Sequence, residues 1–300
     1  MKRKLQQWMD RGRYFTYRGK RIFYIREGKG PTLLIIHGYP YSSYEWLEMV
    51  NKLSQSYSVV IFDLLGMGFS DKPQAHIYSF KEHADIVNSL LAYLNVSETH
   101  ILSHDLGVSI VQELIARDVE GQIDFAIKSS AFLNGGLFMD VYKPRLIQRL
   151  LSQSPTWIGK VLSKAISKKT ICKSVREVYG KNTQPSDQFL DEQWDVLNYN
   201  DGKAIAYLIG RLVFEKKNHQ NRWIKSMQKT TIPMCFINGP ADPNSGIHMA
   251  NRYTTLIPNP KVFLLGSEIG HWPHLENPNG VLKSYEEFKS NLHQLFFCCQ

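Results

Sequence analysis

The sequence at residues 99–108, Thr-His-Ile-Leu-Ser-His-Asp-Leu-Gly-Val, is typical of a strand, a sharp turn and a helix. Asp105 lies at the apex of the turn, with the small residue Ser103 two positions before it and Gly107 two positions after it. Small residues are needed there because the backbones on either side of a tight strand-to-helix turn approach closely. This is the pattern of a nucleophile elbow, with an acid where Ser is usual. An Asp before a helix is also a common N-cap, and other parts of the chain must separate the two interpretations.

Strands alternate with helices through the first 134 residues. Besides the elbow strand, apolar and β-branched runs predict strands at residues 14–17, 21–26, 33–36, 58–62 and 126–133. Helical spacing predicts helices at residues 43–53 and 79–94, the latter capped by Ser79, and from the elbow to about Gly121. Such alternation is typical of an α/β protein whose mostly parallel central sheet is covered by helices on both faces.

The pattern changes after residue 134. Residues 135–229 contain only helical segments and polar turns, strand patterns return at 232–237 and 262–265, and a closing helix is predicted at 281–297. We therefore predict a core in two parts, residues 1–134 and 230–300, with an inserted helical cap, residues 135–229.

Composition describes an ordinary globular chain of 300 residues, 43% of them hydrophobic. No apolar run approaches the roughly 20 residues that span a bilayer, and no apolar segment follows the basic N-terminus. Cysteines 172, 235, 298 and 299 have no spacing typical of a metal site or a disulfide framework, which favours a reducing compartment. We expect a cytoplasmic protein.

The net charge of +9 is concentrated in residues 141–181, which hold ten basic residues and one acid, Glu177. The same segment carries apolar residues at helical spacing: Leu146, Leu150, Trp157, Val161, Leu162 and Ile166. One interpretation is an amphipathic helix pair packed on the core with solvated lysines; the other is weak contact with an anionic membrane. No motif supports binding of nucleic acid.

Three polar residues follow predicted strands, and their order along the chain is informative. They are Asp105, then Asp242 in the turn Gly-Pro-Ala-Asp-Pro, then His271 after Gly270. Nucleophile, acid and histidine follow each other in this order in hydrolases with a catalytic triad on an α/β sheet. Although each residue alone has an ordinary structural explanation, the three together favour a triad.

The chain resembles the α/β-hydrolase family, and within it the branch with an Asp nucleophile, which includes epoxide hydrolases and haloalkane dehalogenases. The resemblance lies in His-Gly-Tyr-Pro at 37–40, Gly-Met-Gly-Phe-Ser at 66–70, the elbow at 103–107, the turn at 239–243 and Gly-His at 270–271. Asn-Gly-Gly at 134–136 and Asn-Asp-Gly at 200–202 look like the mesoderm-specific transcript subgroup. The subgroup name implies no substrate.

The resemblance implies a mechanism. Asp105 would attack an electrophilic carbon to form an ester, and His271, oriented by Asp242, would activate the water that hydrolyses it. The backbone N–H groups of Tyr39 and Leu106 would form the oxyanion hole. We expect a small apolar substrate and no cofactor.

Assistance to the leaving group separates the candidate reactions. Haloalkane dehalogenases usually carry Trp directly after the nucleophile, whereas this chain has Leu106; His-Gly-Tyr-Pro resembles epoxide hydrolases instead, and hydrolysis of an epoxide to a diol is our first prediction. Candidate proton donors from the cap are Tyr207, which we prefer, and Tyr199, Tyr179 and Tyr142. Candidate pocket residues are His37, His104, Trp194 and Trp272.

Two alternatives stay open, dehalogenation and a hydrolase fold kept for binding a ligand or partner without catalysis. We predict no metal site, because Pro273 separates His271 from His274 and the sequence offers no third ligand.

Overall fold

We describe a computed structural model of the chain, covering residues 2–145, 149, 153 and 155–297, with side chains to residue 292. Leu146, Leu150, Cys298 and Cys299, named above, lie outside the described residues.

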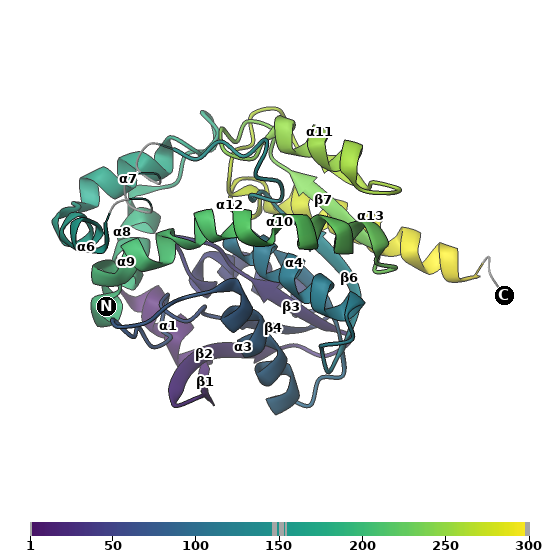
Figure 1. Ribbon diagram of the computed structural model, residues 1–300, viewed down its shortest axis with the longest axis horizontal. Coiled ribbons are helices and arrows are strands. Elements are labelled where there is room, and N and C mark those ends of the chain that lie inside the picture. Colours follow the sequence, from purple (N-terminus) through teal and green to yellow (C-terminus); the bar gives the residue numbers. More distant parts are fainter. Residues whose placement is uncertain (1, 146–148, 150–152, 154, 298–300) are drawn as a thin grey trace.

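Eight strands form one sheet in the order β1-β2-β4-β3-β5-β6-β7-β8 (Figure 1). Pairing of β1 with β2 and of β2 with β4 is antiparallel, and the other neighbours are parallel. The strands are β1 (Arg13–Tyr17), β2 (Lys20–Glu27), β3 (Thr32–Ile36), β4 (Ser58–Phe62), β5 (Glu98–Ser103), β6 (Ala126–Phe132), β7 (Met234–Asn238) and β8 (Val262–Leu264). The predicted fold class, a mostly parallel sheet between helices, is confirmed.

Helices cover both faces of the sheet. Along β3, Leu34 and Ile36 pack in one core while Leu33 and Ile35 pack in the other, because successive side chains of a strand point to opposite faces. The first core contains residues of α3 (Phe80–Tyr93), α4 (Leu106–Val119), α10 (Leu212–Lys229) and α11 (Ile247–Leu256). The second contains residues of α1 (Arg3–Arg11), η1 (Ser43–Trp46), α2 (Leu47–Leu53) and α13 (Pro278–Phe297).

Helices α1 and α11 were not predicted from the sequence. The first forty residues were expected to be β structure, but α1 precedes β1 and buries Leu5 and Trp8, which lie three positions apart on one helical face. Helix α11 follows β7, in a stretch for which no element was predicted. Elsewhere the agreement is close: Ser79 caps α3 by accepting the N–H of Glu82 at 3.1 Å, as predicted.

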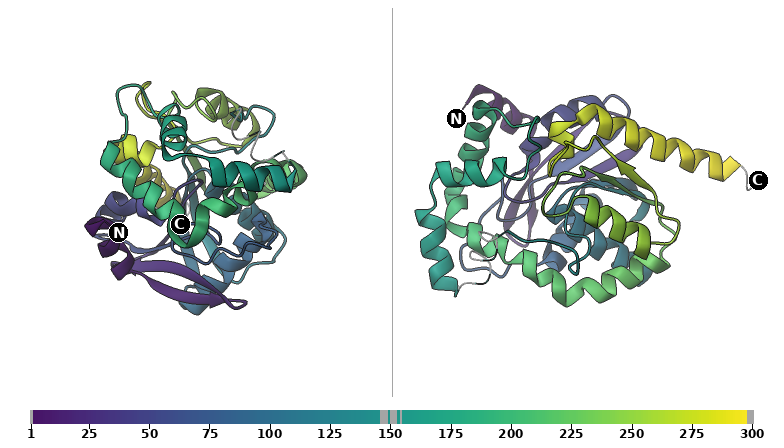
Figure 2. Two further views of the ribbon diagram at one scale, coloured as in Figure 1. Left: turned by 90° about the vertical axis from the view of Figure 1, so that its left-hand side faces the viewer. Right: turned by 90° about the horizontal axis from the view of Figure 1, so that it is seen from above.

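Between β6 and β7 the regular elements of the described residues are helices, joined by turns and loops. These are α6 (Thr156–Ala165), α7 (Lys168–Arg176), α8 (Asp187–Asn198), η2 (Tyr199–Asp201), α9 (Gly202–Gly210) and then α10. Helices α6 to α9 gather at one end of the molecule, whereas α10 runs back along α4 and α13 projects from the opposite end (Figures 1 and 2). None of the helices in the described ranges has the length and apolar content to cross a membrane.

Candidate active site

The turn between β5 and α4 presents Asp105 in a strained backbone conformation, with φ 49° and ψ −109°. Its neighbours leave no room for larger residues: a β-carbon on Gly107 would overlap the carbonyl oxygen of Ile36, and one on Gly38 would overlap the β-carbon of Asp105. The close approach of β3 therefore requires Gly107, as the sequence suggested.

Gly107→Ala should destabilise the fold by about 3 kcal/mol, because the added methyl group must displace the end of β3. Gly121→Ala is the control: its φ is +68° but no atom lies within 4 Å of the added carbon, so only the cost of a left-handed residue, about 1 kcal/mol, is expected. Urea unfolding followed by circular dichroism measures both values. Equal effects of the two substitutions would show that the close approach is not what requires Gly107.

The three residues predicted as a triad lie together. His271 Nδ1 is 2.8 Å from Asp242 Oδ2, and His271 Nε2 is 3.6 Å from Asp105 Oδ2. Asp242 Oδ2 also accepts hydrogen bonds from the Ser245 hydroxyl at 2.5 Å and the Asn134 amide at 3.1 Å. Its Oδ1 accepts the N–H of Asn244 at 2.8 Å, so both oxygens of the carboxylate are fixed. All three side chains of the predicted triad are buried.

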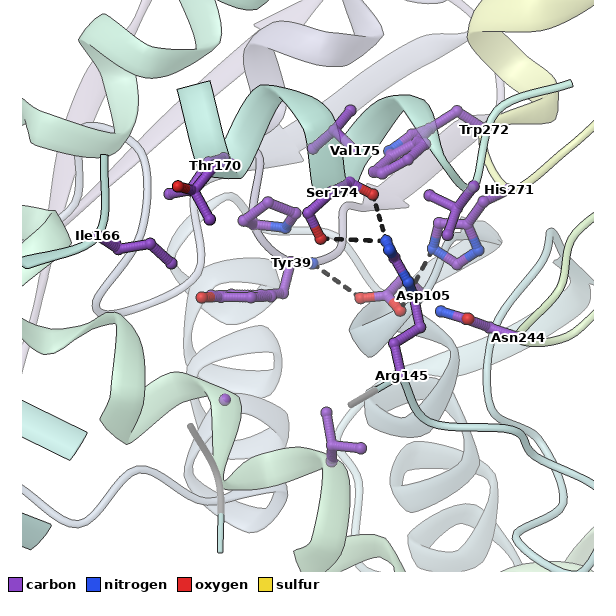
Figure 3. A pocket seen from close by; sticks show the side chains of 15 residues that line it. Tyr39, Asp105, Arg145, Ile166, Thr170, Ser174, Val175, Asn244, His271 and Trp272 are labelled. Atoms are coloured by element: carbon purple, nitrogen blue, oxygen red, sulfur yellow. Dashed lines mark hydrogen bonds and ion pairs between the residues drawn. The ribbon is translucent and has the colours of Figure 1, made fainter. Parts of the chain in front are cut away.

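The backbone around Asp105 supplies hydrogen-bond donors. Tyr39 donates its N–H to Asp105 Oδ1 at 2.8 Å (Figure 3). Leu106 is the first residue of α4, where a backbone N–H has no partner within the helix. These are the two groups predicted for an oxyanion hole; the Leu106 side chain is itself buried, only 1% exposed.

The opposite charges of Asp105 and His271 stabilise each other. Burial opposes ionisation of Asp105, but interaction with His271, and with the more distant Lys216 and His104, holds the pKa of Asp105 well below its usual range. Burial likewise opposes the imidazolium, yet Asp242 and Asp105 raise the pKa of His271 to about 10. These shifts favour an ionised Asp105 beside a protonated His271 near neutral pH.

Asp105 and His271 line a cavity of about 100 Å³ beneath the cap (Figure 3). Most of its wall is apolar, including Ile166, Val175 and Val213. Its polar side chains are Tyr39, Arg145, Thr170, Ser174 and Asn244, in addition to Asp105 and His271. A mainly apolar cavity suits a small apolar ligand.

The four cap tyrosines named as proton donors do not line this cavity. Tyr207 packs against Gly159 of α6, Tyr199 packs edge-on against Phe69, Tyr179 stacks on Trp272 at 4.8 Å, and the ring of Tyr142 lies 5.6 Å from Lys216 Nζ. They are packing aromatics in this structure, and the cap hydroxyls that do face the cavity belong to Thr170 and Ser174. The spacing of residues in the sequence did not distinguish Thr170 and Ser174 from the four tyrosines as residues that face the cavity.

The other candidate pocket residues differ in position. Trp272 lines the cavity, whereas Trp194 does not; it lies under the Lys203 ammonium at 5.5 Å. His37 is fully buried and accepts the N–H of Leu64 at 3.0 Å, which fixes the loop after β4. His104 Nε2 is 2.8 Å from the backbone oxygen of His271 and so holds the histidine loop from behind.

Glu45, which the sequence analysis did not single out, connects several of these residues. Its buried carboxylate accepts the indole N–H of Trp272 at 3.2 Å and that of Trp46 at 3.1 Å. Its Oε1 also lies 3.6 Å from His104 Nδ1 and 3.5 Å from His274 Nε2. Glu45 thus anchors both neighbours of the triad histidine, Trp272 by sequence and His104 by contact. The sequence feature that could have pointed to Glu45 is its position as a lone acid in the aromatic run Tyr-Glu-Trp.

Glu45, His104 and His274 are also the described residues that are grouped closely enough to hold a metal ion. The carboxylate already accepts two indole N–H groups, and the network accounts for its burial without an ion. The sequence offered no third ligand to accompany His271 and His274, whereas in the structure His274 is grouped with Glu45 and His104. This group does not include the triad carboxylates.

Glu45→Gln should lower kcat/KM about tenfold, because weaker anchoring of Trp272 and His104 should raise the activation free energy by roughly 1.4 kcal/mol. The pH profile of activity should shift as well, since the buried carboxylate that faces His104 loses its charge, and the His104 ring lies 4.9 Å from that of His271. Glu48→Gln, one turn along at an exposed position, is the matched control and should leave both unchanged. An unaltered pH profile in Glu45→Gln would contradict a role in positioning.

Comparison with known proteins places the chain in a family. Residues 31–278 match the family model described as alpha/beta hydrolase fold. Over 293 residues, 95% of this chain and 87% of the relative, it is 34% identical to the mesoderm-specific transcript protein of Mus musculus.

Two solved structures share the fold. One, described as epoxide hydrolase CorEH without ligand, matches with a TM-score of 0.75 and 20% identity over 94% of this chain and 99% of that one. The other, a haloalkane dehalogenase variant from Bradyrhizobium elkanii, matches with a TM-score of 0.75 and 17% identity over 93% and 98% of the two chains. Together with the sheet and the elbow, the match to the family model and the relative at 34% identity show that the chain belongs to the α/β-hydrolase family.

Proposed function

We propose that this protein hydrolyses a small apolar epoxide to a diol through an ester on Asp105. One observation carries the proposal: Asp105 faces a mainly apolar cavity with Oδ1 held by the Tyr39 N–H and Oδ2 directed at His271. A carboxylate at an elbow suits attack on sp³ carbon, because forming an alkyl ester removes no proton from the nucleophile.

In the first step, Asp105 Oδ2 attacks a ring carbon of the epoxide. A carbon–oxygen bond forms to Oδ2 while the ring bond breaks, and its electron pair passes to the ring oxygen, which takes a proton from solvent. Esterification removes the charge of Asp105 and so lowers the pKa of His271, which then releases its proton to solvent. The histidine becomes a neutral base only after the ester has formed.

In the second step, His271 takes a proton from water as the water attacks the ester carbonyl carbon. Asp105 Oδ1 becomes the oxyanion, and it already lies 2.8 Å from the Tyr39 N–H, with the Leu106 N–H as the second donor. Collapse breaks the bond to the alkyl oxygen, which receives the proton from His271. The resulting acid form of Asp105 gives its proton back to His271, restoring the resting ion pair.

Ser174 is our candidate for assisting the leaving oxygen, in place of a cap tyrosine. Its hydroxyl accepts a hydrogen bond from Arg145 Nη1 at 3.0 Å, and both residues line the cavity (Figure 3). A hydroxyl that accepts from a cation is a stronger donor through its own proton. It would stabilise the developing alkoxide by a hydrogen bond.

Dehalogenation is less well supported by the same cavity. Haloalkane dehalogenases usually hold the halide with indole N–H groups, but the indole of Trp272, which lines the cavity, donates to Glu45. Position 106 offers a buried Leu rather than a second indole. We therefore favour an oxygen leaving group.

Quenched-flow reaction with epoxides and chloroalkanes of matched chain length, read by intact mass, tests the proposal. An epoxide adds its whole mass to Asp105, whereas a chloroalkane adds its mass less hydrogen chloride, so the adduct identifies the reaction. We expect the first result, with diol as product. A chloroalkane adduct alone would establish dehalogenation. No adduct and no turnover with any compound would favour the non-catalytic binding protein.

A further inference from the structure

Helix α6 is packed with its small residues inward and its large apolar residues outward. Gly159 and Ser163 are buried against α9, where the Ser163 hydroxyl accepts the N–H of Tyr207 at 3.1 Å. Trp157 and Val161, which lie one turn apart, are 70% and 60% exposed. A helix packed on a core normally buries its large apolar residues, so this outward face requires another explanation.

The same outward face is basic. Lys160 and Lys164 are exposed and lie three positions after Trp157 and Val161, respectively, which puts all four side chains on one stripe of the helix. The nearby helix α7 adds the exposed lysines 169 and 173. Glu177, the one acid between residues 141 and 181, is ion-paired with Arg145. No carboxylate of this segment therefore offsets the lysines of the stripe.

The stripe lies beside the active-site cavity in the chain and in space. Ile166 directly follows α6 and lines the cavity, as do Thr170 and Ser174 of α7 (Figure 3). Helices α6 and α7 form the extremity of the molecule at the end opposite the projecting α13 (Figures 1 and 2). A surface that held α6 would therefore also lie next to the segment that walls the cavity.

We infer that the outward stripe of α6, Trp157, Lys160, Val161 and Lys164, docks on an anionic lipid surface, from which an apolar substrate reaches Asp105. Trp is favoured at the boundary between headgroups and acyl chains, and Lys side chains extend from there to anionic headgroups. The mixed stripe thus matches the two chemistries of a bilayer surface, whereas a purely apolar partner surface would leave its lysines unpaired. The substrate class, a membrane-partitioned epoxide, rests on the proposed function; the docking surface does not.

Co-sedimentation of the full chain with vesicles tests the docking without any substrate. Vesicles of phosphatidylcholine alone are compared with vesicles containing about 30% phosphatidylglycerol, at low and high salt. We expect binding to the anionic vesicles, weakened by salt. Trp157→Ser with Val161→Ser should reduce it at least about tenfold, while Ile77→Ser, which removes another exposed apolar side chain, should not.

Charge reversal provides the second arm. Lys160→Glu with Lys164→Glu should also lower binding at least about tenfold, since each Lys near an anionic leaflet contributes about fivefold. Lys225→Glu with Lys229→Glu makes the same change at the same spacing on α10, and it should have little effect. Circular dichroism verifies that the variants are folded.

Three results would overturn the docking surface: equal binding to neutral and anionic vesicles, no binding to either, or a concentration-dependent dimer in sedimentation velocity that Trp157→Ser abolishes. The last would make a second copy the occupant of the stripe. Vesicle binding without epoxide turnover would instead reject the proposed reaction and leave the docking surface intact.

Discussion

Asp105→Asn should reduce kcat/KM for the best substrate of the panel by at least about 10³-fold and abolish the covalent adduct. The amide keeps the shape of the carboxylate but has neither its charge nor its nucleophilicity, while the Tyr39 N–H can still donate to the side-chain oxygen. The loss would therefore report chemistry rather than folding. Steady-state turnover and intact mass are the two measurements.

Two controls sharpen this test. Asp118→Asn makes the same change near the other end of α4 and should retain full activity. Intact mass of the resting variant verifies that the amide at position 105 has not hydrolysed back to the acid. Activity of a verified Asp105→Asn protein above about one tenth of wild type would exclude the ester mechanism.

His271→Gln should stop the reaction halfway. Formation of the ester needs only the carboxylate, whereas its hydrolysis needs the base, so about one equivalent of ester should accumulate while kcat falls at least about 10³-fold. Intact mass detects the trapped adduct, and peptide mapping assigns it to Asp105. Loss of turnover without any adduct would mean that His271 is already required before the ester forms. His248→Gln, at a partly buried site on α11, is the control.

The pH dependence of the two steps should differ in wild type. Ester formation requires ionised Asp105, whose pKa lies well below its usual range, so this step should be flat across neutral pH. Ester hydrolysis requires neutral His271, so its rate should rise with pH and level off above the pKa of His271 in the ester. That pKa must lie below the value of about 10 in the free protein, because one of the two carboxylates that raise it has lost its charge. Single-turnover decay of the ester measures it.

Local patterns accounted for most of the core. The alternation of apolar runs located the strands because parallel strands buried on both faces read as continuous apolar segments, as at 33–36 and 58–62. It missed α1, whose sequence is mainly polar and whose two buried residues, Leu5 and Trp8, are too few to show a period.

Side-chain neighbours that depend on the cap could not be predicted in the same way. The four tyrosines of the cap were equivalent candidates by composition, yet the packing of α6 on α9 and of Tyr179 on Trp272 turned them away from the cavity. Ser174 and Arg145 face it instead, although nothing in their local sequence marks them. The two lie 29 residues apart within the cap, so packing between segments of the cap brings them together.

The sequence by itself determined the fold class and the three residues Asp105, Asp242 and His271, because an elbow and the ends of parallel strands converge by topology alone. The tertiary structure decided which hydroxyls face the carboxylate, that Glu45 anchors the histidine loop, and that α6 turns its Trp outward. These depend on the angle at which helices pack over the sheet, and that angle is set by contacts between distant residues rather than by any local spacing.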